Sequence, residues 1–356
     1  MKKKIWMINQ SKIWGGGEKW FLENSIELLK NNFEVKLLCL SDSAIFKNAR
    51  RKNLNCLKLY KFPINYMILF LNILQRKNIP DLVLTNSGKD YRLAVFLKLF
   101  LRCKYKIYFR RGLDKSLGND FINRFIIKYY IEKIIVNALS IKKTILKKSS
   151  YITEDKIEIV YNGINTDDIN NLKEEKIIFP DNNSTKIGVV ARLSKQKNIP
   201  FLLNSLSKIP HINWTLYIIG DGEEKDFLLD IIKKFSMEKR VKMLGFINNV
   251  FPYVNKMDIF ILPSSQKEGT PNALIEAMYL EKAIIALNCG SIPEIIKHNF
   301  NGLLVEQDNI EELYNAILKL INDYELRKRL GNNARATVEK NFLQKFKTYE
   351  LIKILN

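Results

Sequence analysis

The stretch Glu268 to Glu276, with the sequence EGTPNALIE, predicts a loop that runs into a helix and carries an acid at each end. Before it, residues 257–263 are a short apolar run that ends at a proline, as a buried parallel strand does. After it, residues 273–280 are apolar at helical spacing, with Pro271 at the expected first helical position and Thr270 at the expected N-cap. A helix N-terminus offers free N–H groups and partial positive charge, so the stretch predicts an anion-binding site.

Short apolar runs alternate with amphipathic stretches along the whole chain. The runs have the length of strands, and the stretches between them have apolar residues at helical spacing. This order predicts parallel sheets covered by helices on both faces, the doubly wound α/β class. Strands are expected at residues 4–9, 35–40, 56–60, 82–85, 106–109, 134–137, 157–160, 186–190, 215–219, 241–244, 258–262, 283–286 and 303–305.

The length of 356 residues predicts two domains, because one core rarely serves so long a chain. The polar stretch 161–186, which contains Gly163 and Pro180, is the expected linker. We therefore expect two Rossmann-like domains, residues 1–165 and 166–340, that face a deep cleft. Residues 341–356 are expected to form a C-terminal helix that returns to the first domain.

The formal charge of +21 is concentrated in the first domain. Residues 1–165 hold 32 Lys and Arg against 13 Asp and Glu, whereas the remainder holds 26 against 24. A one-sided basic surface suits an anionic membrane, a phosphorylated substrate or nucleic acid, although solvated surface lysines are an alternative. The sequence has no RNA-binding, zinc-finger or helix-turn-helix signature, so no nucleic-acid partner is expected.

The cysteines and the apolar runs bear on the compartment. Cys39, Cys56, Cys103 and Cys289 lack the spacing of a disulfide or zinc framework. The opening MKKKIWMINQ contains too short an apolar run for a signal peptide, and no run approaches the roughly 20 residues of a membrane span. We expect a cytoplasmic protein, peripheral on the inner face of the cell membrane.

Polar groups follow several predicted strands, where open α/β sheets bind ligands. Gly15, Gly16 and Gly17 precede the first helix and allow a phosphate or sugar to approach, although a tight turn explains them equally well. Arg192 and Lys197 follow the strand at 186–190 and could neutralise a diphosphate.

The acids around these positions have more than one interpretation. Glu276 lies on an otherwise apolar helix and Glu268 in the loop before it, so both could accept hydrogen bonds from sugar hydroxyls, unless they are surface glutamates. Residues 221–223, Asp-Gly-Glu, follow a strand and are expected to cap the next helix rather than bind a metal.

Six motifs in the second half resemble, in order and spacing, glycosyltransferase family 4 (glycosyl transferases group 1), the retaining enzymes of the GT-B fold. The resemblance covers about residues 161–342. It implies a nucleotide-diphosphate sugar donor and chemistry without a metal or other cofactor. The motifs are ARLSKQKN (191–198), YIIGDGEE (217–224), VKMLGF (241–246), DIFILPSSQKEGTPNALIEAM (258–278), GSIPEII (290–296) and NGLLV (301–305).

The resemblance implies roles for individual residues. Arg192 and Lys197 match the basic pair that binds the donor diphosphate and offsets charge on the leaving nucleotide. Glu276 matches the acid that binds the donor ribose, and Glu268 the acid close to the transferred sugar. Further substrate-binding positions are implied for the loop Gly269, Thr270, Pro271 and Asn272, for Gly245 and Phe246 against the base, and for Gly16 and Gly17 over the diphosphate.

The first domain departs from the family pattern at one position. Many relatives carry a histidine after the strand equivalent to residues 106–109, whereas this chain has Arg110, Arg111 and Gly112. Either Arg111 assists the donor or acceptor, with Arg110 as the alternative, or the site is built differently. His211 and His298 are both expected on the surface of the second domain.

The implied function is sugar transfer to a saccharide or lipid-linked acceptor in bacterial surface polysaccharide or lipopolysaccharide synthesis. The first domain would bind the acceptor. Its expected helices at residues 91–104 and 121–139 mix basic, aromatic and aliphatic residues, so they could lie on an anionic bilayer or simply cover the sheet. A GT-B nucleotide-sugar epimerase and a non-catalytic binding module are the alternatives that keep the fold.

Overall fold

The chain forms two compact units. The structure, a computed structural model, describes residues 2–60, 79–112, 117–118, 120–177, 184–209, 212–265 and 268–356. Unit 1 comprises Met1–Gly163 with Gln344–Asn356, and unit 2 comprises Ile164–Leu343. The divisions fall after residues 163 and 343, compared with the expected 165 and 340.

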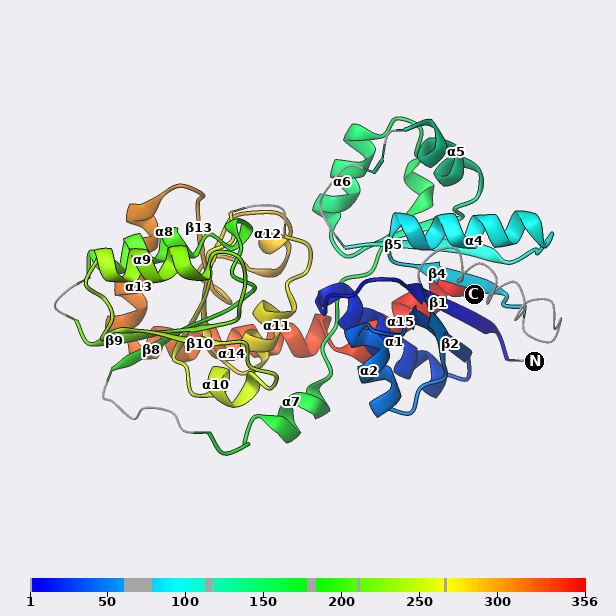
Figure 1. The fold of residues 1–356 in the computed structure, drawn as a ribbon. Helices are drawn as coiled ribbons and strands as arrows, with labels where there is room; N and C mark the ends of the chain where they lie inside the picture. Colours follow the sequence, from blue (N-terminus) through cyan, green and yellow to red (C-terminus); the bar gives the residue numbers. More distant parts are fainter. Residues whose placement is uncertain are drawn as a thin grey trace. The chain divides into compact units, whose positions relative to one another are not determined.

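Unit 1 is built on a seven-stranded parallel sheet in the order β3-β2-β1-β4-β5-β6-β7 (Figure 1). The first strand lies inside the sheet, between β2 and β4, because the chain winds first to one side and then to the other. Most strand residues are buried, which explains why the sequence shows continuous apolar runs. The strands are β1 (Lys4–Asn9), β2 (Glu34–Leu40), β3 (Cys56–Leu59), β4 (Leu82–Thr85), β5 (Lys106–Arg111), β6 (Lys133–Val136) and β7 (Ile157–Ile159).

Helices cover both faces of this sheet. One apolar core joins it to α4 (Gly88–Phe100), α5 (Phe121–Tyr129) and α6 (Leu139–Lys148). The other core joins it to α1 (Gly16–Lys30), α2 (Ala44–Arg51) and the C-terminal α15 (Gln344–Leu355). Leu351 and Leu355 of α15 are fully buried, and each contributes about 2 kcal/mol. The Thr348 hydroxyl also donates to Asn24 Oδ1 of α1 (3.0 Å), so α15 is an integral part of unit 1.

Unit 2 repeats the design with a six-stranded parallel sheet in the order β10-β9-β8-β11-β12-β13. Its first strand, β8, again lies inside, between β9 and β11. The strands are β8 (Thr185–Val190), β9 (Trp214–Ile219), β10 (Val241–Gly245), β11 (Ile259–Leu262), β12 (Ala283–Leu287) and β13 (Leu303–Val305). The doubly wound α/β prediction is therefore confirmed, and all thirteen expected strands lie within one or two residues of their expected bounds.

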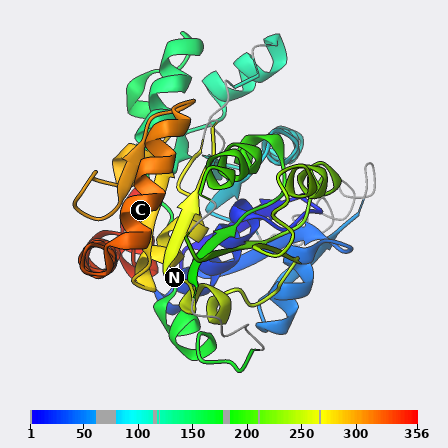
Figure 2. The same ribbon diagram turned by 90° about the vertical axis from the view of Figure 1, so that its left-hand side faces the viewer.

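The helices of unit 2 also divide between the two faces of its sheet. Residues of α8 (Ile199–Ser207), α9 (Lys225–Lys234) and α13 (Ile310–Asn322) share one core, and Figures 1 and 2 show α8 and α9 together on that face. On the other side α11 (Asn272–Tyr279) packs against α14 (Tyr324–Asn341) and β11. The remaining helices are short: α7 (Thr166–Leu172), α10 (Phe251–Asn255) and α12 (Ile292–Ile295).

The division after Gly163 falls within the polar stretch 161–186, where the linker is expected, and the same stretch contains α7, whose N-cap Asn165 accepts a hydrogen bond from Asp167 N (3.1 Å). Three local predictions are wrong. The helix expected at 91–104 is α4, which ends at Phe100, and the one expected at 121–139 ends at Tyr129, because β6 begins four residues later. Finally, Pro271 is the N-cap of α11, with extended dihedral angles (φ −79°, ψ 114°), so the helix begins at Asn272 and Thr270 does not cap it.

Candidate active site

The candidate site of unit 2 lies where the strand order of its sheet reverses. β9 and β11 flank β8 on opposite sides, so the chain segments after β8 and β11 leave the sheet in opposite directions. Open α/β sheets bind ligands in the crevice at such a switch point, at the carboxyl ends of the strands. Lys197 follows β8 and Glu268 follows β11, so the predicted site residues come from both sides of this point.

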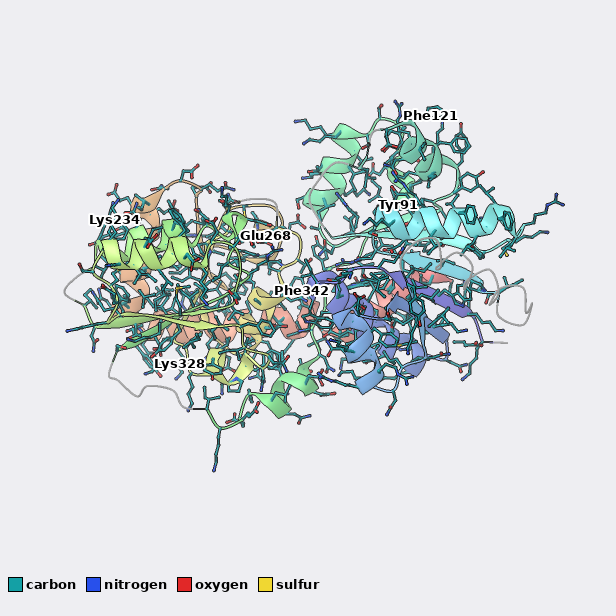
Figure 3. All side chains as sticks on the ribbon, viewed as in Figure 1. Tyr91, Phe121, Lys234, Glu268, Lys328 and Phe342 are labelled. Atoms are coloured by element: carbon teal, nitrogen blue, oxygen red, sulfur yellow. The ribbon has the colours of Figure 1, made fainter. Side chains whose placement is uncertain are left out.

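Lys197 and Glu268 form an ion pair across the switch point, although 71 residues separate them in sequence. The Lys197 ammonium donates to Glu268 Oε1, and the two side chains are only 18% and 9% exposed. Lys197 is the last residue of a 3-10 turn, and Asn198 after it has the left-handed φ of 50° that leads into α8. This sharp turn brings the lysine back toward the loop after β11, which Figure 3 marks at Glu268.

The Glu268 backbone is held by the loop that follows β12. Ser291 N donates to Glu268 O (3.0 Å), and the Ser291 hydroxyl donates to Gly269 O. Gly290 has a left-handed φ of +53°, and a Cβ there would lie 2.3 Å from Glu268 O, so only glycine fits. The neighbouring Cys289 thiol is buried and near Glu268, which together raise its pKa to about 12 and make it unreactive at neutral pH.

The start of α11 combines buried polar groups with a helix N-terminus. Thr270 and Glu276 are 4% and 8% exposed, so the Glu276 carboxylate is not a surface group. The N-cap Pro271 contributes no side-chain acceptor to the first turn of the helix. The helix begins at Asn272, so its partly positive N-terminus lies next in the chain to Glu268, Gly269 and Thr270, where it favours an anion.

Arg192 lies farther along the same edge and has a different partner from Lys197. Its guanidinium pairs with Glu223 Oε2 (3.0 Å), and both side chains are more than half exposed. Backbone N–H groups of Ala191 and Leu193 donate to Ile219 and Asp221, so the segments after β8 and β9 lie together. The expectation that residues 221–223 cap the next helix is wrong, because Glu224 is the N-cap of α9 and no side chain caps it.

Gly245 and Phe246 form an exposed turn at the end of β10. Gly245 has a φ of +68° with open space where a Cβ would point, and its carbonyl accepts a hydrogen bond from Gly220 N (2.8 Å). Phe246 is 71% exposed. An exposed aromatic ring beside a glycine with free space above it can stack on a planar ring such as a base.

In unit 1, Gly16 and Gly17 open α1, with Gly15 as the N-cap, so the helix begins two residues earlier than expected. Arg111 ends β5 and is half-buried, whereas Arg110 beside it is buried and its guanidinium lies against Gly17. Because side chains alternate along a strand, Arg110 and Arg111 point to opposite faces of the sheet.

Sequence reasoning missed the polar cluster that includes Arg110. Its members are the buried residues Asn9, Glu18, Asn137 and Asn162 and the half-buried Asn86. One signal could have found the four asparagines, because each lies at the end of an apolar run predicted as a strand or within two residues after it. His298 is exposed, as expected, and its Nδ1 accepts a hydrogen bond from Leu304 N (3.2 Å), whereas His211 lies outside the described residues. Among the described residues, no group of three or more His, Cys, Asp or Glu could hold a metal ion.

The two parallel doubly wound units define the GT-B class of proteins. The crystal structure of Anabaena HepE in complex with UDP and glucose superimposes on this chain with a TM-score of 0.82, over 99% of both chains, at 20% sequence identity. Residues 170–337 match the family model described as Glycosyl transferases group 1. Most of unit 2 therefore matches this family, as the motifs of the second half predict, and the chain is a glycosyltransferase.

Two relatives extend the similarity to most of the chain. The N-acetylgalactosamine-N,N'-diacetylbacillosaminyl-diphospho-undecaprenol 4-alpha-N-acetylgalactosaminyltransferase of Campylobacter jejuni is 27% identical over 90% of this chain and 91% of its own length. The capsular polysaccharide biosynthesis glycosyltransferase CapM of Staphylococcus aureus is 27% identical over 81% of this chain and 80% of its own length.

Proposed function

We propose that this enzyme transfers a sugar from a nucleoside-diphosphate sugar to a saccharide or lipid-linked acceptor, with retention of the anomeric configuration and without a metal ion. The observation that carries the donor assignment is the Lys197–Glu268 pair at the switch point of unit 2, beside the N-terminus of α11. A half-buried cation and a helix N-terminus suit a diphosphate, and a buried carboxylate beside them suits sugar hydroxyls.

Each part of the donor contacts a different group at this edge of unit 2. The diphosphate lies against Lys197, Arg192 and the first N–H groups of α11, which stabilise charge as the nucleotide departs. Glu276 accepts hydrogen bonds from the ribose hydroxyls, and Phe246 with Gly245 contacts the base. Glu268 holds hydroxyls of the transferred sugar. The acceptor hydroxyl attacks from the face that the nucleotide leaves, and its proton passes to the departing diphosphate.

The relatives suggest the class of acceptor. One of them acts on a diphospho-undecaprenol carrier and another belongs to capsular polysaccharide biosynthesis. We accordingly place this enzyme in the synthesis of a bacterial surface polysaccharide or lipopolysaccharide, with an acceptor that is itself a saccharide or carries one on a lipid.

A lipid-linked acceptor requires contact with a bilayer, and unit 1 offers a surface for it. No helix of the described residues is long and apolar enough to cross a membrane. Two packed helices of the basic unit, α4 and α5, instead expose large apolar side chains, and Figure 3 marks Phe121 at the start of α5. Apolar side chains with nearby lysines and arginines suit an anionic bilayer surface. The exposed apolar residues are Phe96, Leu99, Phe100, Phe121, Ile122, Phe125 and Tyr129.

Donor binding is tested first with a thermal-shift panel of UDP, GDP, ADP and CMP and their sugars, followed by assay of released nucleoside diphosphate. We expect one base to stabilise the protein and its sugar to be consumed only with a suitable acceptor. Binding of none of these ligands would contradict the proposed donor class.

Membrane contact is tested separately by flotation with anionic and zwitterionic vesicles. The protein is expected to float with anionic vesicles at low salt, and Phe121→Ser with Phe125→Ser should reduce the floating fraction several-fold. Equal recovery of the wild type with both kinds of vesicle would contradict an electrostatic contact.

A further inference from the structure

The carboxyl edge of the sheet in unit 1 carries a buried polar cluster that no role above uses. Its central residue is Arg110, near the end of β5, which is only 4% exposed. Around it lie Asn86 after β4, Asn162 after β7 and Glu18 in the first turn of α1, all half-buried or buried. The cluster therefore joins three strand ends to the helix that follows the glycine loop.

The Arg110 guanidinium reaches two of the strand ends. NH1 donates to Asn86 Oδ1 and NH2 to Asn162 Oδ1, both at 3.4 Å. The guanidinium also lies over the ring of Trp20 in α1, 5.1 Å from its centroid. Only a planar fork can make two divergent hydrogen bonds and stack on a ring at the same time.

Asn86 also forms a hydrogen bond with Glu18. Its amide donates to Glu18 Oε1 at 3.4 Å, and Asn9 at the end of β1 donates to the same oxygen at 3.3 Å. The Asn86 amide thus lies between the Arg110 guanidinium and the Glu18 carboxylate. Its oxygen accepts from Arg110, and its nitrogen donates to Glu18. Arg110, Asn86 and Glu18 form a relay of hydrogen bonds that we call the Arg110 relay.

The glycines beside the Arg110 relay leave space for it. A Cβ at Gly17 would lie 3.2 Å from Arg110 NH1, and a Cβ at Gly112 would lie 2.7 Å from the same atom. A Cβ at Gly15 would lie 3.3 Å from Glu18 Oε2. A side chain at Gly17 or Gly112 would therefore crowd the Arg110 guanidinium, and one at the N-cap Gly15 would crowd the Glu18 carboxylate.

A buried guanidinium is costly, and this one is incompletely satisfied. Among the described residues no carboxylate forms an ion pair with Arg110, and its Nε–H has no hydrogen-bond acceptor. Burial lowers the pKa of Arg110 to about 10, while Glu18 acts in the opposite direction. Replacement of such a group by an apolar residue is often neutral or stabilising, so stability alone does not explain its presence.

We infer that the Arg110 relay positions the start of α1, from the N-cap Gly15 to Gly17, and the loop before it for substrate, with Arg110 as the positioning residue. The guanidinium fixes the ends of β4 and β7, and the carboxylate fixes the first turn of α1, so the loop between β1 and α1 has a single shape. Its use in sugar transfer rests on the function proposed above, whereas its effect on the loop does not.

The effect on the loop is measured by hydrogen exchange with mass spectrometry on Arg110→Lys. Lysine keeps the charge but cannot bond Asn86 and Asn162 together. Amides of residues 11–20 are expected to exchange about tenfold faster, with no change in β4 and β5. Arg92→Gln is the matched control, because Arg92 of α4 also donates to an asparagine, Asn123 of α5. This variant should leave the exchange rates of residues 11–20 unchanged. Unchanged exchange in Arg110→Lys, or an equal increase throughout unit 1, would overturn the inference.

A double-mutant cycle tests the coupling between the two charges. Arg110→Gln and Glu18→Gln each leave a buried charge without its counterpart, so the double variant should lose less stability in urea than the sum of the single losses. Additive losses would overturn the relay. Neither the hydrogen-exchange nor the unfolding measurement needs a substrate. If both give the expected result but no nucleotide binds, only the proposed function fails. If a nucleotide binds and these results do not hold, only the relay fails.

Discussion

Replacement of Glu268 by glutamine should increase the affinity of the enzyme for a nucleoside diphosphate while it lowers turnover. In the structure Lys197 is paired with Glu268. A diphosphate that binds Lys197 must compete with this carboxylate and approach its negative charge. Glutamine is nearly isosteric, removes the charge and leaves the lysine available.

The expected gain follows from the burial of the pair. With side chains 18% and 9% exposed, the pair is shielded from solvent and behaves as a charge-assisted hydrogen bond rather than a surface ion pair. Such a bond is worth about 1.5 to 3 kcal/mol. Glutamine keeps part of it as a neutral hydrogen bond, so the diphosphate should gain about 1 to 2 kcal/mol, a Kd lower by about 5- to 30-fold.

The measurement is titration calorimetry with the nucleoside diphosphate that the thermal-shift panel selects. Glu223→Gln is the control, because it frees Arg192 from an exposed pair that solvent already screens, and the Kd should change by less than about threefold. With the complete nucleotide sugar, Glu268→Gln should show a lower kcat, because the sugar hydroxyls exchange a charged acceptor for a weaker, neutral one. A Kd that is unchanged or higher in Glu268→Gln would refute the proposed competition for Lys197.

Three further predictions concern residues that the tertiary structure singles out. Burial raises the pKa of Asp90 from 3.8 to about 6, so the folded state gains stability as pH falls through 6 and gains no more below about 4. This gain, about 3 kcal/mol, should be missing in Asp90→Asn. Urea unfolding at pH 4 to 7 measures it, and free energies of unfolding that change with pH in the same way for the wild type and the variant would contradict it. Gly290→Ala should destabilise unit 2 by at least about 1 to 2 kcal/mol and weaken nucleotide binding, because of the positive φ and the contact with Glu268 O. Gly88→Ala, with no contact closer than 3.5 Å, is the control, and equal urea midpoints for the two variants would argue against this strain. Glu276→Ala should raise the Kd of a nucleoside diphosphate about tenfold or more but leave that of pyrophosphate unchanged, and equal losses for both ligands would exclude a ribose contact.

Most of the fold can be predicted from the sequence, because strands buried on both faces are continuous apolar runs. All the strands in the described residues were anticipated in this way. Helix ends were less accessible, since they depend on contacts beyond the local pattern. The run 121–139 has apolar residues throughout, yet pairing of β6 with β5 and β7 takes residues 133–136 out of the helix.

Part of the candidate site was also accessible, because its residues occur in recognisable motifs. Lys197, Glu268 and the start of α11 were all assigned from the motifs. The pairing of Lys197 with Glu268 was not, since it depends on β8 and β11 being neighbours in the sheet. The partner of Arg192 is Glu223, on the segment after β9, for the same reason.

By itself the sequence determined the two doubly wound units, their strands and the helix that begins within EGTPNALIE, because burial and helix formation depend on local residue patterns. Only the tertiary structure decided which polar side chains meet. Arg110 and Arg111 are neighbours with the same chemistry, and the alternation of β5 buries the first in contact with Asn86 and Asn162. Those partners lie 24 and 52 residues away in sequence, and a contact of that range exists only once the sheet has formed.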